Sequence, residues 1–270
     1  MTRAVDEAAA SSQRNLVDPS RPLGCRIERR CRVGRQNEYD QPIGDAVPAW
    51  SSRLLPPHAS IEGRFCRLEP IDAKLHGPDL FAANAAAADN RAWTYLFQEP
   101  FAEYEAFLAH LEQTQASRDP LFFAVVDSKS HRAVGSLALM RIDPAHGVIE
   151  VGSINYSPLV QRSPAATEAQ YLLMKLVFDT LGYRRFEWKC DSLNAPSRSA
   201  AQRLGFRFEG VFRQAMVYKG RSRDTAWFSI IDSEWHVVKA AMEAWLSSDN
   251  FSSDGTQRMS LADVRRRLVD

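Results

Sequence analysis

A serine-proline pair in the middle of the chain has the character of an anion site. The segment Gln161-Arg-Ser-Pro-Ala-Ala166 follows a strand-like run and opens a run with helical spacing. Ser163 can cap this helix, and Pro164 suits the first helical position, where its missing N–H costs nothing. The small side chains of Ala165 and Ala166 would let a ligand approach the first-turn amides, at the positive end of the helix dipole. The pattern predicts a phosphate site, although a plain strand-to-helix turn uses the same residue types.

A second helix start carries further polar groups. The segment Asn194-Ala-Pro-Ser-Arg-Ser-Ala-Ala-Gln-Arg-Leu-Gly-Phe206 follows another strand-like run, and Gly205 suits a helix end. Asn194 can cap the helix or donate a hydrogen bond from its amide to a ligand. The hydroxyl of Ser197 falls in the first turn, where it can face a ligand or satisfy a backbone group. Cys190 has no histidine near it in sequence, which favours a core or rim thiol over a nucleophile.

Alternating strands and helices would position these residues. Apolar runs and alternation predict strands over residues 65–70, 121–126, 133–142, 148–156, 185–190, 206–218 and 225–231. Helical spacing predicts helices over residues 79–88, 101–117, 167–181, 194–204 and 233–246. A β-meander followed by strand–helix–strand–helix–strand indicates a mixed α/β sheet with helices packed on its faces.

Extensions flank this region. Residues 1–60 contain many prolines and no lysine, and they predict an irregular arm that cannot bury enough surface to fold alone. Residues 247–270 are expected to form a tail with a short helix, which leaves 61–246 as the folded domain. A basic cluster in the arm suggests either a solvated tail or a contact with nucleic acid or the ribosome, and nearby acidic residues favour the solvated tail. This cluster consists of Arg26, Arg29, Arg30, Arg32 and Arg35.

Composition excludes several classes of function. The formal net charge of +1 provides no global field for nucleic acid or an anionic membrane. The four cysteines show no metal-binding spacing with the six histidines, so no metal is expected. The sequence lacks a P-loop, a G-x-G-x-x-G motif and an H-E-x-x-H motif. Without a signal peptide or an apolar span, a cytoplasmic protein is the default expectation.

Together the two helix starts resemble the signature of the GNAT acetyltransferase superfamily. Residues 161–166 resemble the Q/R-x-x-G-x-G/A loop that cradles the pyrophosphate of acetyl-CoA, with Pro164 where glycine is usual. Residues 194–206 resemble the N-x-x-S/A…LGF segment. The runs Lys219-Gly-Arg-Ser-Arg-Asp224 and Asp232-Ser-Glu-Trp235 are similar to the branch of ribosomal-protein N-terminal acetyltransferases of the RimJ/RimL type.

The resemblance covers about residues 60–246 and implies a particular fold and reaction. The fold would be a mixed, mostly antiparallel twisted sheet with helices on both faces and a splayed central strand pair. The reaction would be direct transfer of an acetyl group from acetyl-CoA to a primary amine, either a protein N-terminus or a small molecule, by a monomer or homodimer. The implied acetyl-CoA contacts are Ser153, Ile154, Asn155, Gln161, Arg162, Ser163, Ala165, Ala166 and Asn194.

Two side chains are candidates for the chemistry. Transfer needs a neutral amine, so an ammonium must lose a proton, and the leaving thiolate needs a proton or a hydrogen bond. Glu150 is the candidate base, because some histone-acetylating members carry a glutamate at this offset from the loop; an exposed sheet carboxylate is the alternative. Ala201 stands where many members carry a tyrosine acid. Ser197 is therefore the expected donor, as in RimL-like enzymes, with Tyr156 and Tyr218 in reserve.

Two other functions remain open at the level of sequence. One is a catalytically silent acyl-CoA-binding or sensing module, which would keep the 161–166 loop while lacking the usual tyrosine. The other is an RNA- or ribosome-associated protein that acts through its arginine-rich arm.

Overall fold

The computed structural model describes residues 35–268, which fall into two compact units divided between Trp50 and Ser51. In the first unit, β1 (Arg35–Gln36) and β2 (Pro42–Ile43) form an antiparallel hairpin. The rest of the basic cluster, from Arg26 to Arg32, lies outside the described residues.

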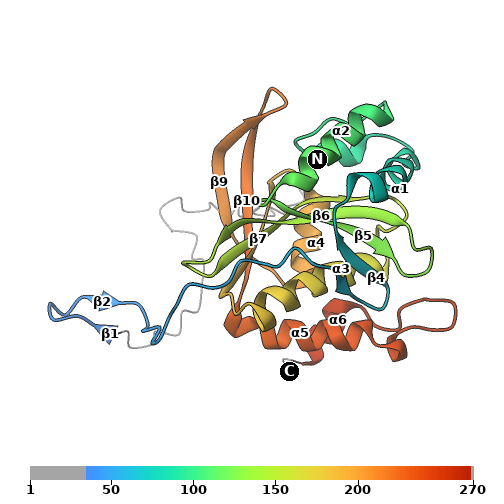
Figure 1. Ribbon diagram of the computed structural model, residues 1–270. Coiled ribbons are helices and arrows are strands. Elements are labelled where there is room, and N and C mark those ends of the chain that lie inside the picture. The colour runs from blue at the N-terminus through green and yellow to red at the C-terminus, as the bar shows by residue number, and fades with distance from the viewer. Residues whose placement is uncertain (1–34, 269–270) are drawn as a thin grey trace, which may run out of the picture. The chain divides into compact units, whose positions relative to one another are not determined.

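The second unit is built on a single eight-stranded sheet with the order β3-β4-β5-β6-β7-β8-β10-β9 (Figure 1). All neighbouring strands are antiparallel except β7 and β8, which are parallel. In chain order the strands are β3 (Ile61–Glu62), β4 (Cys66–Pro70), β5 (Leu121–Asp127), β6 (Ala133–Asp143), β7 (Val148–Tyr156), β8 (Arg185–Asp191), β9 (Arg207–Tyr218) and β10 (Arg221–Ile231). The expected mixed, mostly antiparallel sheet is confirmed.

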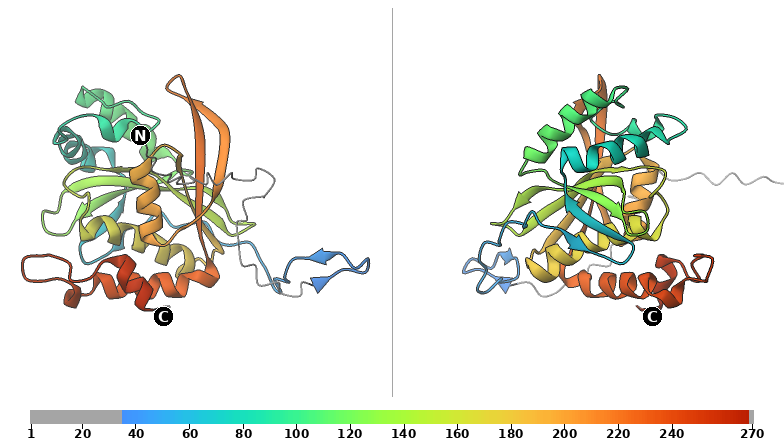
Figure 2. Two further views of the ribbon diagram at one scale, coloured as in Figure 1. Left: turned by 180° about the vertical axis from the view of Figure 1, so that it is seen from behind. Right: turned by 45° about the vertical axis from the view of Figure 1, so that its right-hand side comes forward.

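Helices cover both faces of this sheet, as predicted (Figure 2). They are α1 (Ala73–Ala85), α2 (Tyr104–Ala116), α3 (Pro164–Lys175), α4 (Ala195–Leu204), α5 (Asp232–Leu246) and α6 (Leu261–Arg267), and a π-helical turn over Leu176–Thr180 continues α3. None of the helices in the described part of the chain has the length and apolar character needed to cross a bilayer.

Strand β5 contributes side chains to two hydrophobic cores, one on each face of the sheet. Phe123 and Val125 belong to the large core that includes α3, α5 and α6, whereas Ala124 and Val126 belong to a smaller core with α1 and α2. Successive side chains of a strand point to opposite faces, so a continuous apolar run fits a strand that is covered on both sides.

Helix α1 begins earlier than residue 79. Asp72 caps it, because its Oδ1 accepts hydrogen bonds from the amides of Lys74 (3.0 Å) and Leu75 (2.8 Å). Pro78 consequently lies inside the helix instead of before it.

Glu168 ties α3 to the beginning of β4. Its buried carboxylate accepts hydrogen bonds from the backbone amides of Arg64 (2.9 Å), Phe65 (2.6 Å) and Cys66 (2.9 Å). A side chain at Gly63 would collide with this carboxylate, since a Cβ there would lie 2.6 Å from Glu168 Oε2. The position of α3 under the sheet is thus fixed by a polar contact as well as by its apolar face.

Candidate active site

The central cleft of the second unit opens where β7 and β8 part. Their pairing runs from Val148–Arg185 to Val151–Trp188 and then stops, although both strands continue. A cleft of about 2220 Å³ occupies this region and extends to the starts of α3 and α4 and to the wall formed by β10. The predicted splayed strand pair is therefore present, and it brings together most of the residues singled out from the sequence.

The start of α3 has the capping geometry of an anion site. Ser163 Oγ accepts a hydrogen bond from the Ala166 amide at 3.2 Å, and Pro164 is the first helical residue. Arg162 adopts a left-handed backbone conformation, with φ of 58°, just before the helix. All four of these residues line the cleft, so the positive end of the α3 dipole faces it.

Two other loop residues make different contacts. The side-chain amide of Gln161 donates a hydrogen bond to the Tyr156 carbonyl at 2.6 Å, which braces the loop against the end of β7. Ala165 is buried in the large core and does not line the cleft, so its small side chain serves packing against the sheet.

Strand β7 carries a bulge beside the cleft. Its register against β6 shifts between the Ser136–Asn155 and Ala138–Gly152 pairs, so that Ser153 and Ile154 together face one residue of β6. Ser153 has a φ of 48°. Such a bulge leaves backbone groups outside the sheet ladder, where they can contact a ligand. The bulge was not predicted from the sequence, although the glycine-serine pair inside the strand is a signal for one.

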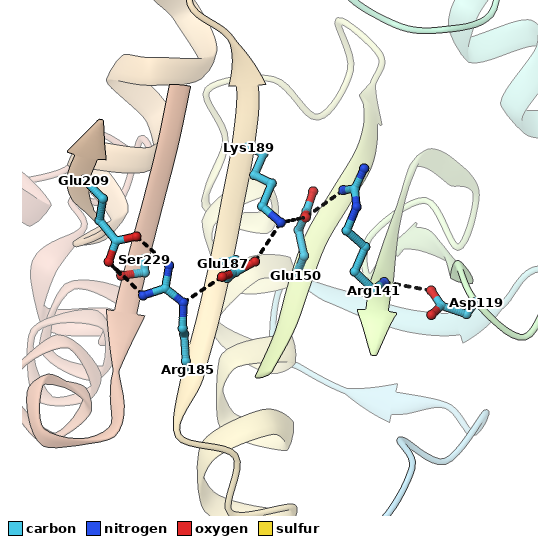
Figure 3. Close-up of polar contacts among 8 residues, drawn as sticks. All are labelled: Asp119, Arg141, Glu150, Arg185, Glu187, Lys189, Glu209 and Ser229. Atoms are coloured by element: carbon cyan, nitrogen blue, oxygen red, sulfur yellow. Dashed lines mark hydrogen bonds and ion pairs between the residues drawn. The ribbon is translucent and has the colours of Figure 1, made fainter. Parts of the chain in front are cut away.

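Glu150 is buried and bound to two cations, as Figure 3 shows. Its Oε2 lies 2.7 Å from an Arg141 guanidinium nitrogen and 2.9 Å from Lys189 Nζ. Both of these contacts are to the same oxygen, Oε2, and Glu150 lines the cleft. The alternative of an exposed sheet carboxylate is wrong, because only 3% of the residue is exposed.

Glu150 belongs to a row of alternating charges whose members come from β6, β7, β8 and β9 (Figure 3). Lys189 also contacts Glu187 at 2.8 Å, and Glu187 binds Arg185 at 2.6 Å. Arg185 in turn binds Glu209, which lowers the pKa of the Glu209 carboxyl. The row was missed from the sequence, but its signal is visible in β8, where charged residues occupy every second position.

Ser197 lies on the other side of the opening, in the first turn of α4. Its amide donates to Asn194 Oδ1 at 3.1 Å, so Asn194 caps the helix. Its hydroxyl oxygen accepts a hydrogen bond from Trp188 Nε1 at 3.0 Å. Asn194, Ser197 and Cys190 all line the cleft. Burial raises the pKa of the Cys190 thiol, which keeps it protonated and poorly nucleophilic.

The reserve tyrosines have other partners for their hydroxyl protons. Tyr218 donates to Asp191 Oδ2 at 2.8 Å, and burial together with this carboxylate raises the pKa of Tyr218 to about 12. Tyr156 donates to the Ala166 carbonyl at 3.4 Å and accepts from Gln170 at 3.0 Å, and burial raises its pKa as well. Each phenol is a weaker acid than a free tyrosine.

No group of three or more His, Cys, Asp or Glu side chains is placed to hold a metal ion within residues 35–268.

Comparison with known proteins agrees with this geometry. Residues 66–207 match the family model described as an acetyltransferase (GNAT) domain. A GCN5-related N-acetyltransferase from Brucella melitensis is 53% identical, with a TM-score of 0.80, over 82% of this chain and 100% of that one. A probable GNAT-family acetyltransferase from Chromobacterium violaceum is 44% identical, with a TM-score of 0.67, over 73% and 98% of the two chains.

A curated relative is more distant. The uncharacterized N-acetyltransferase p20 of Bacillus licheniformis is 27% identical over 42% of this chain, and the match spans 63% of that relative's length. Because the family model covers more than half of the chain and the Brucella structure matches along its whole length, the chain belongs to the GNAT acetyltransferase family.

Proposed function

We propose that this protein transfers an acetyl group from acetyl-CoA directly to a primary amine, without a metal ion or a covalent enzyme intermediate. The acceptor is a protein N-terminus or a small-molecule amine. The observation that carries the proposal is the single cleft that joins the α3 start, the β7 bulge, Ser197 and Glu150. These are the parts that acyl transfer requires: a site for the donor's diphosphate, a hydrogen-bond donor near the leaving group and a carboxylate for the amine proton.

The residues at the α3 start fit the diphosphate of acetyl-CoA, which supplies the acetyl group as a thioester. The capped first turn directs its dipole at the cleft, Arg162 adds a cation, and Ala166 leaves room for close approach. Along β7, the bulge at Ser153 and Ile154 frees backbone groups that would bind the amide-containing arm of the same substrate.

Glu150 is proposed to accept the amine proton through Oε1. The two cations on Oε2 hold the carboxylate in one orientation. It would take the amine proton either directly or through a water molecule. Ser197 is proposed to direct its hydroxyl proton at the leaving sulfur.

A finer assignment to the RimJ/RimL branch rests on residues 219–224 and 232–235. A putative ribosomal-protein-serine acetyltransferase from Vibrio cholerae shares the fold at 23% identity and a TM-score of 0.54. The microcin C7 self-immunity acetyltransferase MccE shares the fold at 21% identity and a TM-score of 0.57, and its crystal structure is of a complex with acetyl-CoA and AMP. The names of these two proteins describe different roles on one fold, so the acceptor class must be decided at the site itself.

The decisive experiment measures release of coenzyme A by the purified chain against a panel of amines. One arm contains peptides with free N-termini, including those of ribosomal proteins, and the other contains small-molecule amines. We expect turnover in one arm and mass-spectrometric identification of an N-acetyl product. Normal acetyl-CoA binding with no turnover on any amine would favour a silent binding module instead.

A further inference from the structure

Three polar groups without partners lie along β10, on the wall of the cleft. They are Arg223 Nε, Thr225 Oγ1 and Trp227 Nε1, each buried and without a hydrogen bond among the described residues. All three residues line the cleft. They alternate with the core residues Ala226 and Phe228, so they share one face of the strand.

Arg223 is the most unusual member of this row. The residue is only 7% exposed, yet within residues 35–268 no carboxylate lies close enough to form an ion pair with it. Its guanidinium instead lies against two aromatic rings, 5.5 Å from the centroid of Phe97 and 5.7 Å from that of Tyr218. Such rings attract a cation but satisfy none of its N–H groups.

Two neighbouring cations of the hairpin differ from Arg223 because their side chains have hydrogen-bond partners. Lys219 donates to the Trp93 carbonyl at 2.8 Å, and Arg221 donates to the Thr94 carbonyl at 2.7 Å. These two bonds hold the β9–β10 hairpin, which projects beyond the rest of the sheet in Figure 1, against the segment that follows α1. An unpaired buried charge is costly, and proteins that retain one generally place a counter-ion beside it.

The row leads toward the candidate base. Trp227 pairs with Lys189 of the neighbouring strand β8. Lys189 Nζ lies 3.7 Å from the centroid of the Trp227 ring and also binds Glu150 at 2.9 Å. Arg223 lies four residues before Trp227 on the same strand. This separation corresponds to roughly 13 Å at about 3.3 Å per residue. An amine beside Glu150 and an anion at Arg223 would therefore be separated by several bonds.

We propose that the acceptor amine carries an anionic group, a carboxylate or a phosphate, that binds Arg223 with Thr225 and Trp227 as further donors. The planar guanidinium suits either anion through two parallel hydrogen bonds. This inference rests on the proposed function, since it names the class of amine that the same cleft accepts.

The test compares acceptors that differ only in charge. One series contains ω-amino acids of increasing chain length, a second the ω-amino alcohols of equal length, and a third the aminoalkyl phosphates. A peptide arm compares aspartate with asparagine at the second position. We expect kcat/KM to favour an anionic acceptor over its neutral match by at least tenfold at the best length. The phosphate and peptide arms then identify the source of the anion.

Variants assign this preference to Arg223. Arg223→Gln should abolish it, mainly by raising KM, and Arg223→Lys should retain part of it. Arg221→Gln is the matched control, because it removes a guanidinium two residues away that is already bound to a carbonyl, and it should keep the preference. Since Arg223 Nε has no hydrogen-bond partner among the described residues, we expect the glutamine variant to fold, as circular dichroism and thermal unfolding can verify.

A binding measurement separates this inference from the proposed function. Calorimetry with alkyl carboxylates and alkyl phosphates, which carry no amine, should detect binding to the parent and at least tenfold weaker binding to Arg223→Gln. That result would support the anion site even if no amine were acetylated, in which case only the proposed function would fail. Equal use of charged and neutral acceptors at every length, or anion binding unchanged in Arg223→Gln, would overturn the inference.

Discussion

Trp188 donates a hydrogen bond from Nε1 to the hydroxyl oxygen of Ser197 at 3.0 Å. Trp188 is the last residue of β8 that pairs with β7, and Ser197 stands in the first turn of α4. The bond thus joins the point where the strands part to the helix beside the opening. Because the indole occupies a lone pair of the oxygen, the hydroxyl proton of Ser197 can be donated to another acceptor, and the Cys190 side chain is one such partner within reach.

We expect Ser197→Ala to lower kcat with little change in KM for the amine. A hydrogen-bond donor that acts on developing charge contributes about 2–4 kcal/mol to transition-state stabilisation, so the loss should be about 30- to 900-fold. Ser197→Cys should recover part of the rate. Trp188→Phe, which keeps the hydroxyl but frees its orientation, should have a smaller effect. Steady-state kinetics decides, and a silent Ser197→Ala would exclude this role.

Tyr218→Phe should leave kcat within a few-fold of the parent, because the Tyr218 proton already serves Asp191. A crippling effect of this variant or of Tyr156→Phe, together with a silent Ser197→Ala, would identify a tyrosine as the donor.

The raised pKa of Tyr218 predicts how the stability of the protein changes at alkaline pH. The pKa of Tyr218 is raised from the ordinary tyrosine value of 10.0 to about 12, by burial and by Asp191. Its contribution to folding is therefore complete below pH 10 and is lost as pH rises toward 12. The stability difference between the parent and Tyr218→Phe should shrink between about pH 9 and about pH 11. Urea unfolding at both pH values measures it, and a difference that grows with pH would contradict the assignment.

Glu150→Gln should lower kcat by about 10²- to 10⁴-fold, the range for loss of a general base. Affinity for acetyl-CoA should be unchanged, and the loss should diminish at high pH, where more amine is neutral without help. Rates and calorimetric affinities measured from neutral to alkaline pH test this expectation. A variant as fast as the parent at neutral pH would end the proposed role.

Glu187→Gln provides the matched control for that experiment. Glu187 is also buried, pairs with Glu150 across β7 and β8, and shares Lys189 with it, yet it does not line the cleft. Either substitution leaves a cation short of a carboxylate, so both should destabilise the fold to a similar degree. Only Glu150→Gln should abolish proton transfer. Equal loss of kcat in both variants would mean that the charge row acts by holding the sheet together.

Ala166→Asp should weaken acetyl-CoA binding by at least tenfold, which corresponds to about 1.4 kcal/mol. The new carboxylate would stand at the α3 start, where we expect the diphosphate to bind. Ala106→Asp is the matched control, because Ala106 is likewise the third residue of its helix but is exposed and does not line the cleft. Calorimetry that found unchanged affinity in Ala166→Asp would mean that residues 161–166 form only a turn.

Local patterns were sufficient to predict much of this structure. The strands of the meander and the caps at Ser163 and Asn194 depend on residues close in sequence, and all of them are present. The fold class followed from the order of these elements together with the two family motifs.

What could not be predicted depends on contacts between distant residues. The bulge at Ser153 is defined only by register against β6, and the placement of β10 beside β8 follows from pairing across the sheet. The two cations on Glu150 come from β6 and β8, so the charge row exists only in the assembled sheet. Nothing in the sequence marked Arg223 either, because the lack of a hydrogen-bond or ion-pair partner is visible only in the folded structure.

The contact between Glu168 and the amides of residues 64–66 has a consequence for the order of folding. It joins segments 102 to 104 residues apart, and contacts of such separation form late because the intervening chain must first be organised. The first turn of α3 therefore reaches its final place only when β4 has joined the sheet. Recovery of acetyl-CoA binding during refolding should then coincide with completion of the whole unit, whereas a peptide of residues 156–180 should not bind it.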